Sequence, residues 1–166
     1  MCYASDQVTG PGAAILLLSS RLLDPLDGWI ARRRDQVSLY GTVLDLVVDL
    51  LTHSIVWVMS GLWFGPVFIA LEWVAGFGIL SAMRRDVAWK SFLSADAPGW
   101  IKAYFRNGMR NGWCACGVVG HFIVPAAAIS GLDPVLTLPL VPGLLLYEAV
   151  TVYLIVASLQ SREHSS

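Results

Sequence analysis

Residues 39–60 read LYGTVLDLVVDLLTHSIVWVMS, an apolar run that carries two aspartates and no lysine or arginine. About 20 consecutive apolar residues are enough to cross the hydrocarbon core of a bilayer as an α-helix. A chain in lipid must satisfy its own backbone hydrogen bonds, and a helix does so within one segment. The stretch therefore predicts a membrane-spanning helix.

Comparable apolar stretches occur elsewhere in the 166-residue chain, at about residues 12–30, 62–83, 112–129 and 135–159. Linkers rich in Gly and Pro, such as SGLWFGP and SGLDP, separate some of them. The composition agrees, because 56% of residues are hydrophobic and 14% are charged, against roughly a quarter charged in soluble domains. The predicted fold class is an all-α, polytopic membrane helical bundle with about five transmembrane helices, in a single domain over residues 1–166.

Basic residues predict how the bundle is oriented. Arg32, Arg33 and Arg34 follow the first predicted span, and Arg162 follows the last. Six more lie between the third and fourth spans: Arg84, Arg85, Lys90, Lys102, Arg106 and Arg110. The loops at the other ends of the spans, residues 59–66 and 130–134, contain no Lys or Arg. By the positive-inside rule the basic side is cytoplasmic and the N-terminus lies across the membrane.

Other features narrow the functional class. A net charge of −1 gives no support to a nucleic-acid partner. Three cysteines are too few for a disulfide framework, and the polar first ten residues do not resemble a cleavable signal peptide. Residues 88–105 mix aromatic residues with lysines, which favours a segment lying in the cytoplasmic interface or a wet loop with aromatic anchors.

Two aspartates lie near the cytoplasmic end of the first predicted span, and two lie in the cytoplasmic half of the second. Asp24 and Asp27 are three residues apart, and Asp45 and Asp49 are four apart, so each pair shares one face of a helix. A short connection makes the two helices antiparallel neighbours, so the two faces can converge. Converging carboxylates repel one another unless a cation lies between them, and oxygen ligands suit Mg²⁺ or Mn²⁺. The simpler alternative is a set of hydrogen-bonded acids with a structural role; intramembrane acids are more often functional.

The spacing of these residues matches a known pattern, D-x-x-D-G-x-x-A-R-x8-G-x-x-x-D-x-x-x-D. The matching positions are Asp24, Asp27, Gly28, Ala31, Arg32, Gly41, Asp45 and Asp49. With this pattern the chain resembles the CDP-alcohol phosphotransferases, and the signature is specific.

The resemblance implies a membrane enzyme that exchanges the CMP of a CDP-linked donor for an alcohol and releases CMP. It implies that the four aspartates hold Mg²⁺ or Mn²⁺, as two ions, with Asp49 as the catalytic base. It also implies that Gly28, Ala31, Arg32 and Gly41 contact the CDP donor. A homodimer is a candidate assembly.

The region around Gln36, Ser38 and Tyr40 is most similar to the eukaryotic phosphatidylinositol synthase branch, and Glu72 and Tyr104 fit that branch loosely. This implies CDP-diacylglycerol as donor, inositol as acceptor, membrane lipid as the surroundings and the endoplasmic reticulum as the location. Glycerol 3-phosphate or serine as acceptor, and a non-catalytic membrane scaffold, are the alternatives.

The chain departs from the family in three ways. Leu50 replaces the arginine that normally follows the last aspartate in the inositol branch, and Pro25 follows Asp24. The family has a sixth span, and the first span is missing here, so we expect an N-terminally truncated chain.

Five further polar positions are candidates for a role. Arg106 and Arg110 are four apart, and they are candidates for contacts with the acceptor or phosphate, or else solvated interfacial arginines. His53 follows Asp49 by one turn and is a candidate ligand or proton relay, although a hydrogen-bonded histidine is commoner. His121 and Glu148 are expected to join helices through polar contacts.

Overall fold

The computed structural model describes residues 12, 39–83 and 97–163, with side chains to residue 160. Apart from Gly12, the first predicted span lies outside these residues. Five predicted site residues, and the proline that departs from the family pattern, also lie outside the described residues: Asp24, Asp27, Gly28, Ala31, Arg32 and Pro25.

The described part of the chain is helical and contains no strand, which confirms the all-α prediction. Its α-helices are α2 (Leu39–Ser60), α3 (Gly65–Met83), α4 (Gly99–Phe105), α5 (Gly112–Ile129) and α6 (Val141–Glu163). Two 3₁₀ segments, η2 (Arg106–Met109) and η3 (Pro134–Leu140), precede α5 and α6. Three segments within the described residues are long and apolar enough to cross a membrane, namely Leu39–Ser60, Gly112–Ile129 and Pro134–Gln160. A shorter apolar helix covers Gly65–Ser81.

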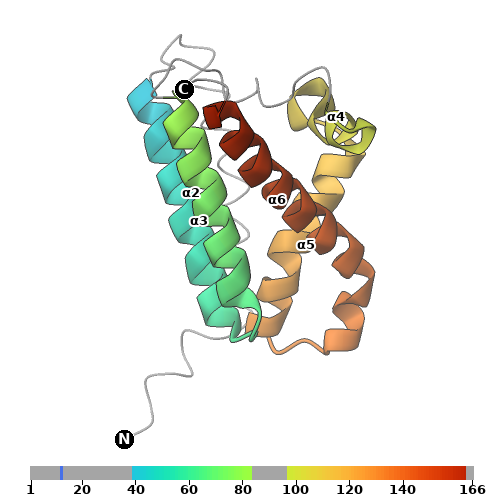
Figure 1. Cartoon of the computed structure of the whole chain (residues 1–166). Coiled ribbons are helices and arrows are strands. Elements are labelled where there is room, and N and C mark those ends of the chain that lie inside the picture. The colour runs from blue at the N-terminus through green and yellow to red at the C-terminus, as the bar shows by residue number, and fades with distance from the viewer. Residues whose placement is uncertain (1–11, 13–38, 84–96, 164–166) are drawn as a thin grey trace, which may run out of the picture.

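The helices form two antiparallel pairs, α2 with α3 and α5 with α6 (Figure 1). The pairs pack together through contacts of α2 with α5 and of α3 with α6. The loops after α2 and after α5 lie at one end of the bundle. The beginning of α2, the short helix α4 and the end of α6 lie at the other end (Figure 1).

Gly and Pro explain where the helices differ from the predicted spans. Gly61 has a φ of 65° and ends α2, and α3 does not begin until Gly65, with Pro66 in its first turn. The predicted span over 135–159 is one apolar segment but two elements, η3 and α6. Pro139 and Pro142 lie at this junction, where each lacks the N–H that a continuous α-helix would need.

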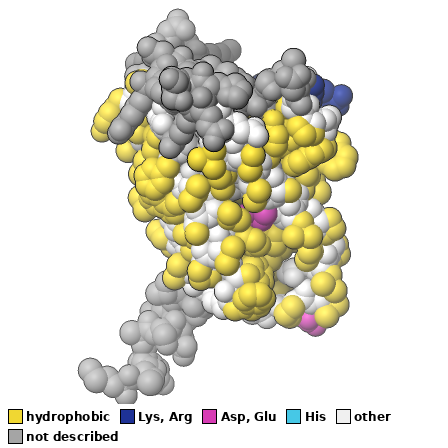
Figure 2. Space-filling model, in the orientation of Figure 1, with side chains coloured by type: hydrophobic (Ala, Val, Ile, Leu, Met, Phe, Trp, Pro, Cys, Tyr) yellow, Lys and Arg dark blue, Asp and Glu magenta, His cyan; other side chains and the backbone are white. Residues whose placement is uncertain are grey.

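Burial is concentrated between the helix pairs. Trp57 of α2, 1% exposed, packs with Val124 of α5 and Leu144 of α6. The outer face of α2 carries exposed apolar side chains at helical spacing: Leu44, Val48, Leu51, Ile55 and Val58. Hydrophobic side chains also cover most of the face shown in Figure 2, with Lys and Arg near α4. A helix that is apolar on both its inner and outer faces is typical of a membrane bundle.

Candidate functional site

The start of α2 carries the two predicted aspartates that the structure describes. Gly41, Asp45 and Asp49 succeed one another at intervals of one turn, so they share one face. Asp45 is exposed and Asp49 is half-buried, and carboxylate oxygens are the ligands that Mg²⁺ and Mn²⁺ prefer. The pair therefore fits half of the predicted metal site, and the other half falls outside the described residues.

One turn deeper, α2 joins α3 through a buried hydrogen bond. His53 Nδ1 lies 2.6 Å from Glu72 Oε1. His53 is 6% exposed and Glu72 is 4% exposed, so both are buried. Polar groups at such a depth are stable only when they have partners. The structure thus shows His53 as a hydrogen-bonded histidine of the bundle.

His121 of α5 connects Glu148 of α6 to the His53–Glu72 pair. Its Nδ1 lies 3.0 Å from Glu148 Oε1, and its Nε2 lies 3.3 Å from Glu72 Oε1. Trp57 Nε1 donates a hydrogen bond of 3.1 Å to the same Nε2. The prediction that His121 and Glu148 join helices is confirmed, and they do so as part of a larger network.

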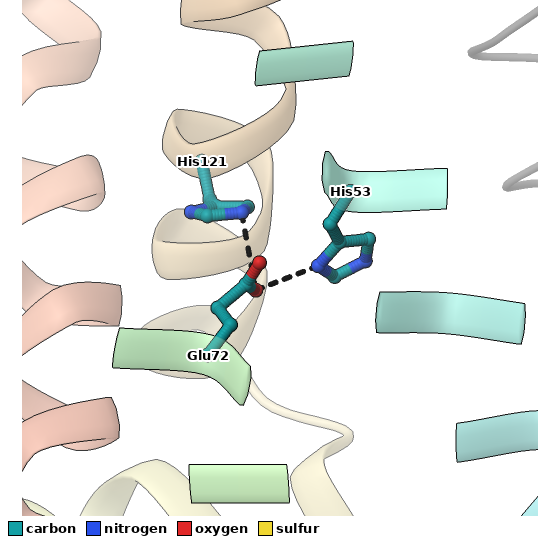
Figure 3. Close-up of side chains that lie close together, drawn as sticks. All are labelled: His53, Glu72 and His121. Atoms are coloured by element: carbon teal, nitrogen blue, oxygen red, sulfur yellow. Dashed lines mark hydrogen bonds and ion pairs between the residues drawn. The ribbon is translucent and has the colours of Figure 1, made fainter. Parts of the chain in front are cut away.

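The network has the donor groups of a metal centre. His53, Glu72 and His121 point toward one another from three helices (Figure 3), and each offers a ligand atom within 4.8 Å of the others. Within the described residues, the buried side-chain atoms without a hydrogen-bond partner are His53 Nε2, Glu72 Oε2 and Glu148 Oε2. We call His53, Glu72, His121 and Glu148 the inner cluster. The sequence signalled its members singly, as polar residues in apolar spans, and gave no sign that they meet.

Arg106 begins the 3₁₀ segment η2 and Arg110 follows it, so both belong to an irregular turn. All three residues between them, Asn107, Gly108 and Met109, have positive φ. The four-residue spacing of the arginines therefore does not place them on one face of an α-helix. Both arginines are exposed, and their predicted contact with acceptor or phosphate stays a prediction.

The turn is held in place by Asn111 and α4. Asn111 donates to the carbonyls of Tyr104 and Arg106 at 2.8 Å each, and it caps α5 by accepting from the Cys114 N–H. Tyr104 is buried against α5, and burial, followed by the nearby Cys114 thiol, raises the pKa of its hydroxyl. The Tyr104 ring thus packs against α5, and its backbone carbonyl is linked to the arginine turn through Asn111.

Comparison with known families matches residues 3–156 to the family described as CDP-alcohol phosphatidyltransferase. The match covers the predicted aspartates and the whole inner cluster. The chain belongs to this family. Members generally use a divalent metal ion, and they are transferases of phospholipid synthesis.

Curated relatives of this family member come from Arabidopsis thaliana. Over 116 residues the chain is 28% identical to "Probable CDP-diacylglycerol–inositol 3-phosphatidyltransferase 2", covering 61% of this chain and 48% of the relative. Over 75 residues it is 35% identical to "CDP-diacylglycerol–inositol 3-phosphatidyltransferase 1", covering 45% of this chain and 31% of that relative. The chain thus spans about half or less of the relatives it matches. No solved structure matches significantly.

Proposed function

We propose that this CDP-alcohol phosphatidyltransferase family member transfers a phosphatidyl group from CDP-diacylglycerol to myo-inositol, giving phosphatidylinositol and CMP. The observation that carries the proposal is the complete signature from Asp24 to Asp49 within the family match. The printed names of the two Arabidopsis relatives support inositol as the acceptor.

In this proposal Asp24, Asp27, Asp45 and Asp49 hold two Mg²⁺ or Mn²⁺ ions, which neutralise the donor diphosphate when bound. Asp49 takes the proton of an inositol hydroxyl. The hydroxyl oxygen then forms a bond to the phosphorus that carries diacylglycerol, and the bond from that phosphorus to the CMP oxygen breaks. Asp49 is half-buried and one turn from Asp45, so it lies close enough to the ligand carboxylates to act beside them.

Donor and acceptor contacts are assigned around this centre. Gly28, Ala31, Arg32 and Gly41 contact the CDP donor, and Arg106 and Arg110 contact the acceptor or a phosphate. Support comes from Figure 1, where the beginning of α2 and the α4 region that precedes the arginine turn lie at the same end of the bundle. We place this end on the cytoplasmic side by the distribution of basic residues, and we place the chain in the endoplasmic reticulum membrane by analogy with the eukaryotic inositol branch. A homodimer is the assembly we propose, by analogy with the family.

The test uses the full chain in lipid vesicles, with radiolabelled inositol, CDP-diacylglycerol and Mn²⁺ or Mg²⁺. We expect phosphatidylinositol from the parent chain and a fall of about 100-fold or more for Asp49→Asn, because a general base typically contributes that much. Asp133→Asn is the matched control, since Asp133 lies in the loop between α5 and α6, where its side chain accepts a hydrogen bond from Val135 N–H. Asparagine can make the same cap.

The outcomes separate the alternatives. If product forms with glycerol 3-phosphate or serine and none forms with inositol, the acceptor is that other alcohol and the assignment of inositol is wrong. No product from the parent chain with any of the three acceptors would favour a non-catalytic scaffold.

A further inference from the structure

The inner cluster carries more negative charge than its hydrogen bonds can satisfy. Glu72 and Glu148 bring two carboxylates into the interior, at 4% and 6% exposure. Tyr147 Oη donates to Glu72 Oε1 at 2.9 Å, yet one oxygen of each carboxylate has no partner. A buried carboxylate is costly unless it is paired or coordinates a metal.

The hydrogen bonds of His121 determine which of its two ring nitrogens carries the proton. Indole N–H can only donate, so the bond from Trp57 makes His121 Nε2 an acceptor and leaves the proton on Nδ1, which donates to Glu148. His121 Nε2, which accepts from Trp57, then lies 3.3 Å from a Glu72 oxygen that is also an acceptor. Two acceptors at this distance repel each other unless something positive lies beside them.

One pair of these atoms already has the separation of two ligands in a metal centre, whereas His53 Nδ1 and Glu72 Oε1, at 2.6 Å, would have to move apart to hold an ion. With bonds of about 2.0–2.1 Å, neighbouring ligands of a tetrahedral Zn²⁺ ion lie about 3.3 Å apart, the separation of His121 Nε2 from Glu72 Oε1. Metal-binding histidines usually donate their second ring N–H to a carboxylate. His121 has this arrangement already, through Glu148.

We propose that His53, Glu72 and His121 bind a divalent transition-metal ion, with Zn²⁺ as the best fit, and that Glu148 orients His121 from outside the ligand set. The ion would balance the two buried carboxylates, and it would replace the His53–Glu72 hydrogen bond and the Trp57–His121 hydrogen bond with metal–ligand bonds. A water completes the coordination. The site ties α2, α3 and α5 together.

This centre is separate in chemistry from the aspartate site of the proposed function. Imidazole nitrogens favour Zn²⁺, Cu²⁺ or Ni²⁺, whereas a set of carboxylates favours Mg²⁺ or Mn²⁺. The inner cluster begins one turn deeper on α2 than Asp49.

The experiment loads the purified, chelator-treated full chain in lipid nanodiscs with Zn²⁺ or Co²⁺. We expect about one Zn²⁺ per chain and the visible absorption bands of tetrahedral Co²⁺. His121→Ala and Glu72→Gln should lose both, and Glu148→Gln should weaken binding by about 10- to 100-fold. Size-exclusion profiles check that each variant folds. Glutamine has nearly the same shape as glutamate, so Glu72→Gln carries the test if His121→Ala does not fold.

Three control variants make the result specific. Trp57→Phe removes the hydrogen bond that competes for His121 Nε2 and should bind metal at least as tightly as the parent. His164→Ala tests the chain's third histidine and should leave binding unchanged. Asp49→Asn should lose transfer activity and keep the Co²⁺ bands, so failure of the proposed function and failure of this site are distinguishable. Absence of the bands from the parent chain, or their persistence in a folded Glu72→Gln chain, would overturn the proposal.

Discussion

Leu50 shows how one residue separates this chain from the branch it most resembles. It follows Asp49, where the inositol branch normally has arginine, and it is 6% exposed. Its side chain packs over Gly76 of α3, where an added Cβ would come within 2.6 Å of Leu50 Cδ1. The position is therefore part of the contact between α2 and α3, and it favours an apolar residue.

Leu50→Arg should lower the stability of the bundle, because an arginine in the middle of a membrane helix costs about 2.5–3.5 kcal/mol. Leu50→Met is the control, since it keeps a similar apolar volume. Thermal unfolding in detergent, followed by loss of the monodisperse peak, measures the difference. An arginine variant as stable as the parent and with a lower KM for inositol would instead assign residue 50 to the acceptor site.

Among the helices, α5 and α6 make the closest contact, and two glycines allow it. A Cβ on Gly143 would collide with the carbonyl oxygen of Cys116. A Cβ on Gly120 would collide with Leu144 N and lie 2.6 Å from Gly143 C. These atoms belong to the backbone and cannot move aside, so the helices would have to separate. Small residues at crossings are how membrane helices reach close packing.

Gly120→Ala should therefore destabilise the α5–α6 pair by about 1–3 kcal/mol, the usual cost of overpacking. Gly112→Ala on the same helix is the matched control, because nothing lies within 4 Å of a Cβ there. Cysteine crosslinking between α5 and α6, together with thermal unfolding, measures the effect. Equal stability of the two variants would contradict the close contact. Because Gly120 precedes His121, the same substitution should also weaken metal binding at the inner cluster.

At the scale of the whole molecule, the two ends of the bundle differ in charge. Lys102, Arg106 and Arg110 belong to the α4 end, whereas the loops 61–64 and 130–133 carry no Lys or Arg. The face between the ends is largely apolar (Figure 2). An uneven distribution of this kind orients a membrane protein with the basic end in the cytoplasm.

Single-cysteine labelling tests this orientation. In a chain with Cys2, Cys114 and Cys116 replaced by serine, Lys102→Cys should react with an impermeant maleimide only from the cytoplasmic side. Leu132→Cys, half-exposed in the opposite loop, should react only from the other side. Both positions reacting from the same side would contradict the topology.

Local patterns in the sequence were sufficient for two of the helices and for the shared face of Asp45 and Asp49. The predicted spans 39–60 and 112–129 coincide with α2 and α5, because an uninterrupted apolar run must form its hydrogen bonds within itself. Asp45 and Asp49 share a face because helical geometry alone sets their relation. The segment 135–159 was harder to predict, since the sequence does not show whether neighbouring helices compensate for Pro139 and Pro142.

The inner cluster could not be predicted from the sequence, because its members meet only in the tertiary structure. His53, Glu72 and His121 lie on three helices, and their distances depend on the rotation and depth of each helix against the others. Those in turn depend on side-chain packing, such as Leu50 over Gly76 and Gly120 against α6. Sequence spacing carries no record of such contacts. The sequence by itself thus determined the membrane helices, the signature and the family, and only the packed bundle decided that the buried histidines and glutamates form one centre.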